Sequence, residues 1–269
     1  MVRAIERIER DIAVLEEAIQ AIAVELQSAY ASYLAMLGQA LRKQLILASY
    51  HLCTQGYPEN FLNLSLNQRQ QLQQGIRKLG QQAAEQLLTV ITEKHEEASE
   101  EGEVISELSD SSDFAFNLKT SDPLELAKWQ QRLEELIQKL LKGVSHDANH
   151  LFQKTGIVPK KLPEPIFEAA AAASEASSEV MPGLPNLLNL VIEIENEQDG
   201  EESSLTQIMA INLRLGEIEF AEPNLSSSRR QIRNILIQLN KLGREYQKKQ
   251  KEYSVAEAEA AWRASWFED

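Results

Sequence analysis

The sequence predicts a mainly α-helical protein built from long coiled-coil helices, two of them in an antiparallel helical hairpin, with a small antiparallel β-hairpin module. Three observations lead to this fold class. Apolar residues recur every three or four positions in the first helix, and an alternating apolar pattern occurs only late in the chain. Alanine, leucine, glutamate, glutamine and lysine are frequent, whereas glycine and aromatic residues are few, a composition typical of long helices.

The first helix is expected over residues 2–53, because no proline interrupts this stretch. Its apolar positions form a heptad seam, which must be buried against another helix. The sequence leaves open whether that helix belongs to the same chain or to a second copy, so a homo-oligomer is one expectation. The seam, which we predict to be an interaction surface, consists of Ile5, Ile8, Ile12, Leu15, Ile19, Ile22 and Leu26.

A second helix is expected to begin after Ser65, since Ser65 and Gln68 have the spacing of a capping box. The connection from the first helix is short, which favours an antiparallel hairpin of the two helices. Residues 1–95 are therefore predicted to form an N-terminal helical hairpin.

Two linkers are expected to flank a third helix. Residues 96–120 are acidic and serine-rich, which predicts a flexible linker, and residues 156–187 are rich in proline, alanine and serine. Between them, residues 121–155 carry a heptad-like apolar stripe. Asp122 followed by Pro123 is a strong start signal for this helix.

Residues 188–269 are predicted to form a β-hairpin followed by a long basic helix. Apolar residues alternate from Leu188 and again up to Leu215, on either side of a turn-like Asp-Gly pair. Gly216 then shifts the alternation to Ile218 and Phe220, which suggests a third short strand. Asn224 or Ser226 is expected to cap the last helix.

The net charge of −14 argues against a general nucleic-acid binder, but the charge is unevenly distributed. Cations gather in the last helix. We expect this basic patch to meet an acidic part of the same chain or a partner protein, with nucleic acid or an anionic membrane surface as the alternative. The patch consists of Arg229, Arg230, Arg233, Lys241, Arg244, Lys248, Lys249 and Lys251.

No motif predicts an enzyme, and we expect no cofactor. His146 and His150 are four residues apart, as in zinc-binding helices, but no third ligand is evident, so they are only weak metal candidates. Cys53 is the only cysteine, and a buried thiol is its default interpretation. Trp262, Trp266 and Phe267 give the end of the chain unusual apolar area. They either pack on the protein's own helices or anchor a partner.

The stretches QLILASYHLCTQGYPENFLNLSLNQRQQLQQ (residues 44–74) and EAEAAWRASWFED (residues 257–269) resemble conserved uncharacterised proteins of cyanobacteria. The resemblance implies a cyanobacterial cytoplasmic setting and no particular activity. A cytoplasmic location also agrees with the absence of a secretory signal and of an apolar stretch of about 18 residues. The order of helix, β-hairpin and helix over residues 121–155, 188–220 and 225–265 is similar to prefoldin-like chaperones, apart from the long linker 156–187.

The sequence therefore favours a non-enzymatic coiled-coil scaffold or adaptor that mediates protein–protein interaction or assembly. Two alternatives stay open. One is a peripheral binder of anionic membrane or nucleic acid that uses residues 229–251, and the other is a prefoldin-like chaperone.

Overall fold

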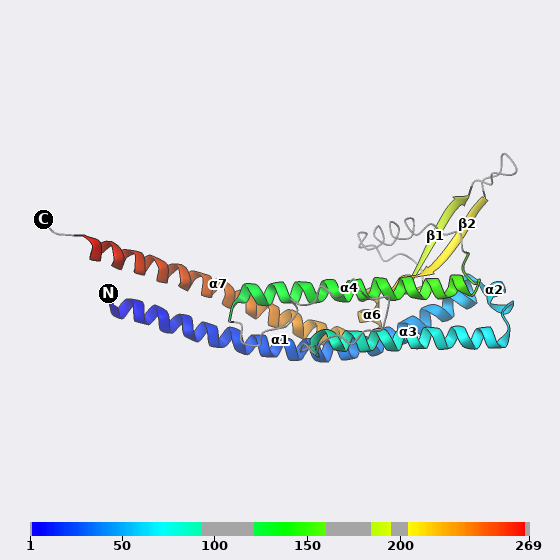
Figure 1. The fold of residues 1–269 in the computed structure, drawn as a ribbon, viewed down its shortest axis with the longest axis horizontal. Coiled ribbons are helices and arrows are strands. Elements are labelled where there is room, and N and C mark those ends of the chain that lie inside the picture. The colour runs from blue at the N-terminus through cyan, green and yellow to red at the C-terminus, as the bar shows by residue number, and fades with distance from the viewer. Residues whose placement is uncertain (1, 93–120, 160–183, 195–203, 267–269) are drawn as a thin grey trace, which may run out of the picture. The chain divides into compact units, whose positions relative to one another are not determined.

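The structure is a computed structural model that describes residues 2–92, 121–159, 184–194 and 204–266 (Figure 1). The chain divides into two compact units. Within the described ranges, long helices are accompanied by one two-stranded antiparallel sheet, which confirms the predicted fold class. Unit 1 comprises Met1–Tyr33, Val90–Glu134 and Ser227–Asp269, and unit 2 comprises Leu34–Thr89 and Glu135–Ser226.

Helix α1 runs without a break over Val2–His51, close to the predicted span. A π-helical turn, η1 (Leu52–Gly56), and the short helix α2 (Pro58–Leu62) then reverse the chain. The apolar stripe of α1 remains buried beyond the predicted seam. The buried positions after Leu26 include Tyr30, Tyr33, Leu34, Leu37, Leu41 and Leu45.

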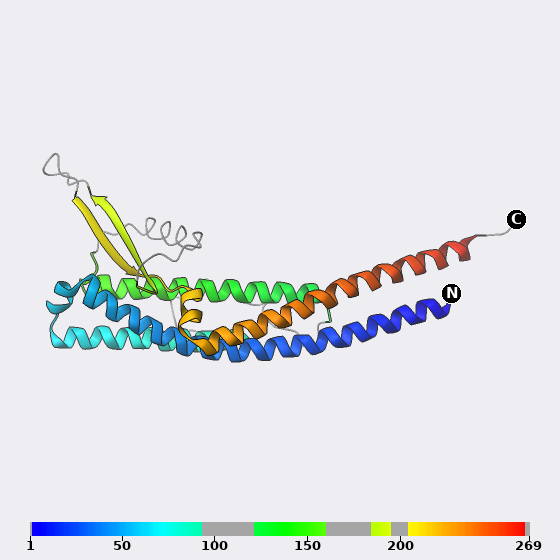
Figure 2. The same ribbon diagram turned by 180° about the vertical axis from the view of Figure 1, so that it is seen from behind.

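In unit 1, the first part of α1 lies beside α7 (Pro223–Ser265) in antiparallel orientation, as Figures 1 and 2 show. Of the predicted seam, Ile12, Ile19, Ile22 and Leu26 are buried, and Ile5, Ile8 and Leu15 are half-buried. Polar contacts beside the seam join the two helices. The Tyr246 hydroxyl donates to Glu16 at 3.2 Å, the Tyr253 hydroxyl donates to Glu9 at 3.2 Å, and Lys249 pairs with Asp11 at 3.0 Å.

In unit 2, α3 (Leu66–Thr92) packs antiparallel against the second half of α1, as the sequence predicts. The capping box is formed. The Ser65 N–H donates to Gln68 Oε1 at 2.9 Å, and the Gln68 N–H donates to Ser65 Oγ at 3.3 Å. Gly38 allows the close approach of the two helices, because a Cβ at this position would lie 3.0 Å from the Cβ of Ala84.

Both ends of α4 (Pro123–Lys154) follow the sequence signals. The Leu124 N–H donates to the Asp122 carboxylate at 2.9 Å. At the other end Gly156 adopts a φ of 80°, which is the left-handed conformation that glycine tolerates. The N–H groups of Gly156 and Ile157 bond back to the carbonyls of Gln153 and Phe152, at 3.1 and 3.0 Å, in a Schellman motif.

The sheet pairs β1 (Leu187–Ile194) with β2 (Ser204–Ile211) in antiparallel register, from Leu187 opposite Ile211 to Ile194 opposite Ser204. This confirms the predicted β-hairpin, but the second strand ends at Ile211, whereas the alternation predicted it up to Leu215, where a helix begins. The Asp199-Gly200 turn of the hairpin lies outside the described residues, as do the predicted linker 96–120 and most of the linker 156–187.

Side chains of neighbouring helices cover the outer edge of β2. The amide of Asn149 on α4 donates to the Ile211 carbonyl and accepts from the Ile211 N–H, both at 2.8 Å. Ser145, one turn earlier, accepts from the Leu213 N–H at 2.9 Å, and the Tyr57 hydroxyl accepts from the Met209 N–H at 3.0 Å. These side chains satisfy backbone groups that would otherwise be an open sheet edge.

We expect Asn149→Leu to loosen the β-hairpin, because both backbone groups of Ile211 then lack their partner. Each unsatisfied backbone group costs about 1–3 kcal/mol where it is buried. Hydrogen exchange of the Ile211 amide should accelerate, while the amides of α3 should be unaffected. The matched control is His150→Leu, since His150 is the exposed neighbour of Asn149 on α4. Equal protection of Ile211 in wild type and Asn149→Leu would contradict this role.

The prediction of a third strand at Ile218 and Phe220 was wrong. Residues Leu215–Ala221 form helix α6, in which Ile218 is buried and Phe220 is 89% exposed. A third strand would have paired with the outer edge of β2, and the side chains of α4 and Tyr57 already cover that edge. The start of α7 also differs from the prediction. The helix begins at Pro223 instead of after Asn224 or Ser226, and the Ser226 hydroxyl bonds back to the Glu219 carbonyl at 2.5 Å.

Candidate interaction surface on helix α7

The inner face of α7 is fixed within unit 1 by apolar packing. Ile232, Ile235 and Leu239 are buried, and Tyr246 and Tyr253 continue this face toward α1 with their hydroxyl contacts. An α-helix turns by about 100° per residue, so these positions share one side of α7. The opposite side of the helix is therefore the side on which an interaction surface can lie.

A buried polar cluster anchors the start of this inner face. The guanidinium group of Arg229, 9% exposed, bonds to both carboxylate oxygens of Glu134 and donates to the Tyr33 hydroxyl at 2.7 Å. It also lies 4.4 Å from the centroid of the Tyr33 ring. The Tyr30 hydroxyl donates to Glu134 at 2.6 Å, and burial together with this carboxylate raises the pKa of Tyr30. The cluster joins α1, α4 and α7.

The structure splits the predicted basic patch into two groups. Arg229 belongs to the buried cluster. Lys249 pairs with Asp11 and Glu252, and these hydrogen bonds raise the pKa of its ammonium group. The other six are exposed and lie within an arc of about 80° on the side of α7 opposite the buried face. They are Arg230, Arg233, Lys241, Arg244, Lys248 and Lys251.

Four exposed apolar residues lie on the same arc. Ile237 is 66% exposed, Val255 is 51% exposed, and Trp262 and Trp266 are each 66% exposed. The two tryptophan rings are 5.7 Å apart between centroids. Phe267, predicted to act with them, lies outside the described residues. We call the six cations and four apolar residues together the outer stripe of α7.

Positive charge in the outer stripe is not neutralised by ion pairs within the described part of the chain. None of its six cations forms an ion pair with a described residue. Among the acidic residues of α7, Glu252 pairs with Lys249 at 3.1 Å and Glu259 pairs with Arg263 at 3.7 Å. Glu245, next to Arg244, is exposed and forms no ion pair with a described residue, so it lowers the net charge of this side of the helix by one. The stripe can therefore attract an anionic surface, and its apolar members can contact that surface.

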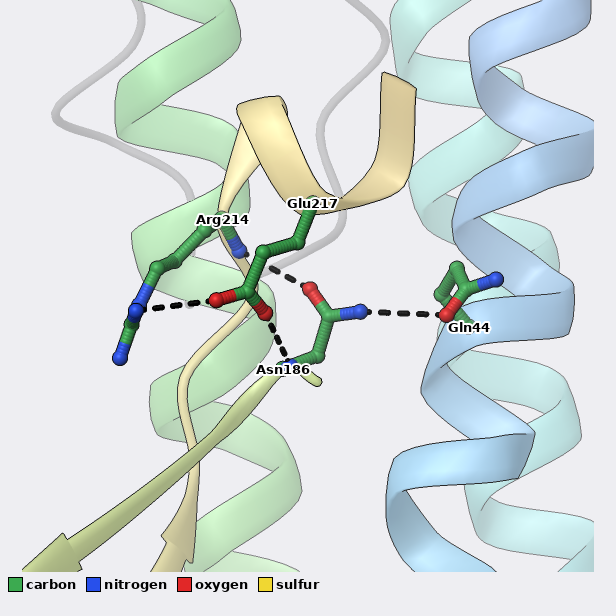
Figure 3. Close-up of polar contacts among 4 residues, drawn as sticks. All are labelled: Gln44, Asn186, Arg214 and Glu217. Carbon is green, nitrogen blue, oxygen red and sulfur yellow. Dashed lines mark hydrogen bonds and ion pairs between the residues drawn. The ribbon is translucent and has the colours of Figure 1, made fainter. Parts of the chain in front are cut away.

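A second polar cluster, in unit 2, is structural. Asn186 adopts a left-handed φ of 59°, and its N–H donates to Glu217 (Figure 3). Its side chain donates to Gln44 Oε1 at 3.1 Å and accepts from the Arg214 N–H at 3.1 Å. Arg214 also pairs with Glu217 at 2.9 Å. The cluster attaches the base of the β-hairpin to α1 and α6, and its charged groups neutralise one another.

His146 and His150 lie on the exposed side of α4, next to the residues that hold β2. His146 Nδ1 is 3.3 Å from a carboxylate oxygen of Asp147. Within the described ranges, no group of three or more histidine, cysteine, aspartate or glutamate side chains is placed to hold a metal ion.

We expect the Cys53 thiol to react slowly in the folded protein. Cys53 is buried, and burial raises the pKa of its thiol from 9.0 to about 11. The thiolate form of a cysteine is the form that attacks thiol reagents, and a thiol with this pKa is mostly protonated at pH 8. Labelling with an aromatic disulfide reagent should be slow in buffer and fast in urea, with Ser28→Cys as an exposed reference. Equal rates for both thiols in the folded protein would contradict the buried position.

Ionisation of Cys53 should also lower the stability of the folded protein at high pH, because the thiol ionises at a lower pH in the unfolded chain than in the folded protein. The free energy of unfolding should therefore fall as the pH rises from about 9 to about 11, by an amount that Cys53→Ala removes.

Comparison of the chain with protein-family models, curated proteins and solved structures gave no match. No helix in the described part of the chain combines the length and the apolar character needed to cross a bilayer.

Proposed function

We propose that the protein is a non-enzymatic scaffold or adaptor that holds a binding partner, either a macromolecule or a membrane surface, on the outer stripe of α7. The observation that carries this proposal is the outer stripe itself, in which six unneutralised cations and four exposed apolar side chains lie along one side of one helix. Large apolar side chains at an exposed surface, rimmed by charge, are typical of interaction sites.

Contacts on the side of α7 opposite the stripe hold this helix in place within unit 1. Arg229, the apolar inner face and the contacts to α1 leave the helix little freedom to turn the stripe inward. A partner that binds the stripe therefore meets a preformed surface, which lowers the entropic cost of binding. The predicted seam of α1 is buried or half-buried, and polar contacts beside it join α1 to α7. We therefore place the recognition surface on α7 and not on the seam.

Site-specific photo-crosslinking in cells tests the proposal. A photoreactive residue placed at Ile237 or Val255 should give covalent adducts with the partner, either a macromolecule or membrane lipid. The control positions are Val14 on α1 and Phe220 on α6, which are 65% and 89% exposed but lie outside the stripe. Adducts from the stripe positions alone are expected. The proposal fails if the stripe positions yield no adduct, or if all four positions yield the same adducts.

A further inference from the structure

We infer that the partner of the outer stripe is a membrane surface that carries anionic lipid headgroups, along which α7 binds peripherally. This inference rests on the proposed function and specifies the chemistry of its partner. It uses only residues of unit 1, from Arg230 to Trp266.

The cations of the stripe match a layer of lipid phosphates. From Arg230 to Lys251 they extend over about 30 Å of helix, at about 1.5 Å per residue. Each lysine or arginine near an anionic leaflet adds to the attraction, and clusters of four to eight on one helix are typical of binding to anionic lipid. Because all six lie within one narrow arc, a flat surface can reach all of them at once.

The apolar members favour lipid over nucleic acid. Trp262 and Trp266 are large and amphipathic, and such side chains partition to the headgroup region of bilayers. Ile237 and Val255 can enter the same region, whereas a duplex offers phosphates to the cations and nothing apolar to these four side chains. Binding of single-stranded nucleic acid needs aromatic residues among the cations, on which the bases can stack. Both tryptophans lie beyond Lys251, the last cation of the stripe.

The mode of binding follows from the buried inner face of α7. Ile232, Ile235 and Leu239 are already packed within unit 1, so α7 cannot turn a wide apolar face toward the acyl chains. Only the stripe is available, and electrostatic attraction should dominate the affinity. Binding should therefore be reversed by salt and should leave the helix content unchanged, since α7 is already folded.

The test is flotation of the full-length protein with vesicles made of equal parts phosphatidylglycerol and phosphatidylcholine, at low and high salt. Vesicles of phosphatidylcholine alone are the lipid control. The stripe variant carries Lys241→Gln, Arg244→Gln, Lys248→Gln and Lys251→Gln. The matched control variant loses the same charge from exposed cations on α3 and α4, through Arg77→Gln, Lys78→Gln, Lys128→Gln and Arg132→Gln.

We expect wild type and the control variant to float with anionic vesicles at low salt and to be released at high salt. The stripe variant should bind about 1,000-fold more weakly, since each of the four lost cations contributes about a factor of five. In a Trp129→Phe background the emission of Trp262 and Trp266 should shift to the blue on binding, while the circular dichroism spectrum stays constant. This background removes the only tryptophan outside the stripe.

Two results would overturn the inference: wild type failing to float with anionic vesicles, and an equal loss of binding in the stripe and control variants. If a DNA duplex or polyglutamate then binds with dependence on the stripe, the partner belongs to another class of macromolecule. Failure here is distinguishable from failure of the scaffold proposal, because protein adducts from Ile237 and Val255 would still support that proposal.

Discussion

Replacing Arg229 with leucine is expected to lower the free energy of unfolding of unit 1 by about 3–5 kcal/mol, among the largest effects of any single substitution. The substitution leaves Glu134 without its cation and removes the Arg229 donor from the Tyr33 hydroxyl, in a nearly closed environment. Glu134 is 25% exposed, so water screens part of the loss, and the lower end of this range is expected. Urea unfolding followed by circular dichroism measures the change.

Two further variants separate charge from packing. Arg230→Leu removes the neighbouring arginine, which is exposed, and should change stability by less than about 0.5 kcal/mol. The double variant Arg229→Leu with Glu134→Leu removes both charges, and it should be more stable than Arg229→Leu alone. A double variant less stable than Arg229→Leu alone would contradict this prediction, because the cost of the single substitution would then not come from an unpaired carboxylate.

Ile19→Asn is expected to destabilise unit 1 by about 3–5 kcal/mol. Ile19 is completely buried at the centre of the predicted seam, and asparagine brings an amide without a partner into that site. Val24→Asn is the matched control on α1, because Val24 is 51% exposed, and it should cost little.

The outcome of Ile19→Asn also distinguishes folding from assembly. If the seam pairs within one chain, Ile19→Asn should reduce the helix content and lower the unfolding midpoint, and this midpoint should not depend on protein concentration. A seam between two chains would instead give a folded protein whose mass, measured by light scattering, falls to that of one copy. That second result would contradict the pairing of α1 with α7 in one chain.

Local signals predicted the helices and the β-hairpin well. The capping box at Ser65, the start at Asp122 and the stop at Gly156 are each recognisable from a few residues, because they satisfy backbone groups of their own segment. The failure at residues 215–221 has the opposite cause. Whether Ile218 joins a third strand depends on Asn149 and Ser145, far away in sequence, since they cover the edge of β2.

The candidate surface was only partly readable from the sequence. The sequence shows the eight cations as one patch. It does not show that Arg229 and Lys249 are set apart from the other six, because their partners Glu134 and Asp11 lie on other helices. The sequence contains a pattern that could have revealed the outer stripe. Cationic and apolar residues follow one another at steps of three and four from Arg230 to Val255, which places them on one side of a helix, and Trp262 lies on the same side. The polar cluster around Asn186 had a weaker signal, the tolerance of asparagine for a left-handed φ.

In this structure α1 and α7 pair within one chain and leave the outer stripe of α7 available. Zero-length carbodiimide crosslinking tests it directly, because it couples the Lys249 ammonium group to the Asp11 carboxylate across their 3.0 Å contact. Equal amounts of unlabelled and heavy-nitrogen-labelled chain are mixed, unfolded, refolded together and crosslinked. The Lys43–Glu222 contact in unit 2, 2.8 Å apart, is the internal reference.

Mass spectrometry of the joined peptides then gives the answer. We expect the Asp11–Lys249 crosslink with both peptides light or both heavy. Joined pairs of one light and one heavy peptide at this contact would show that the two helices come from different chains, and would contradict the account.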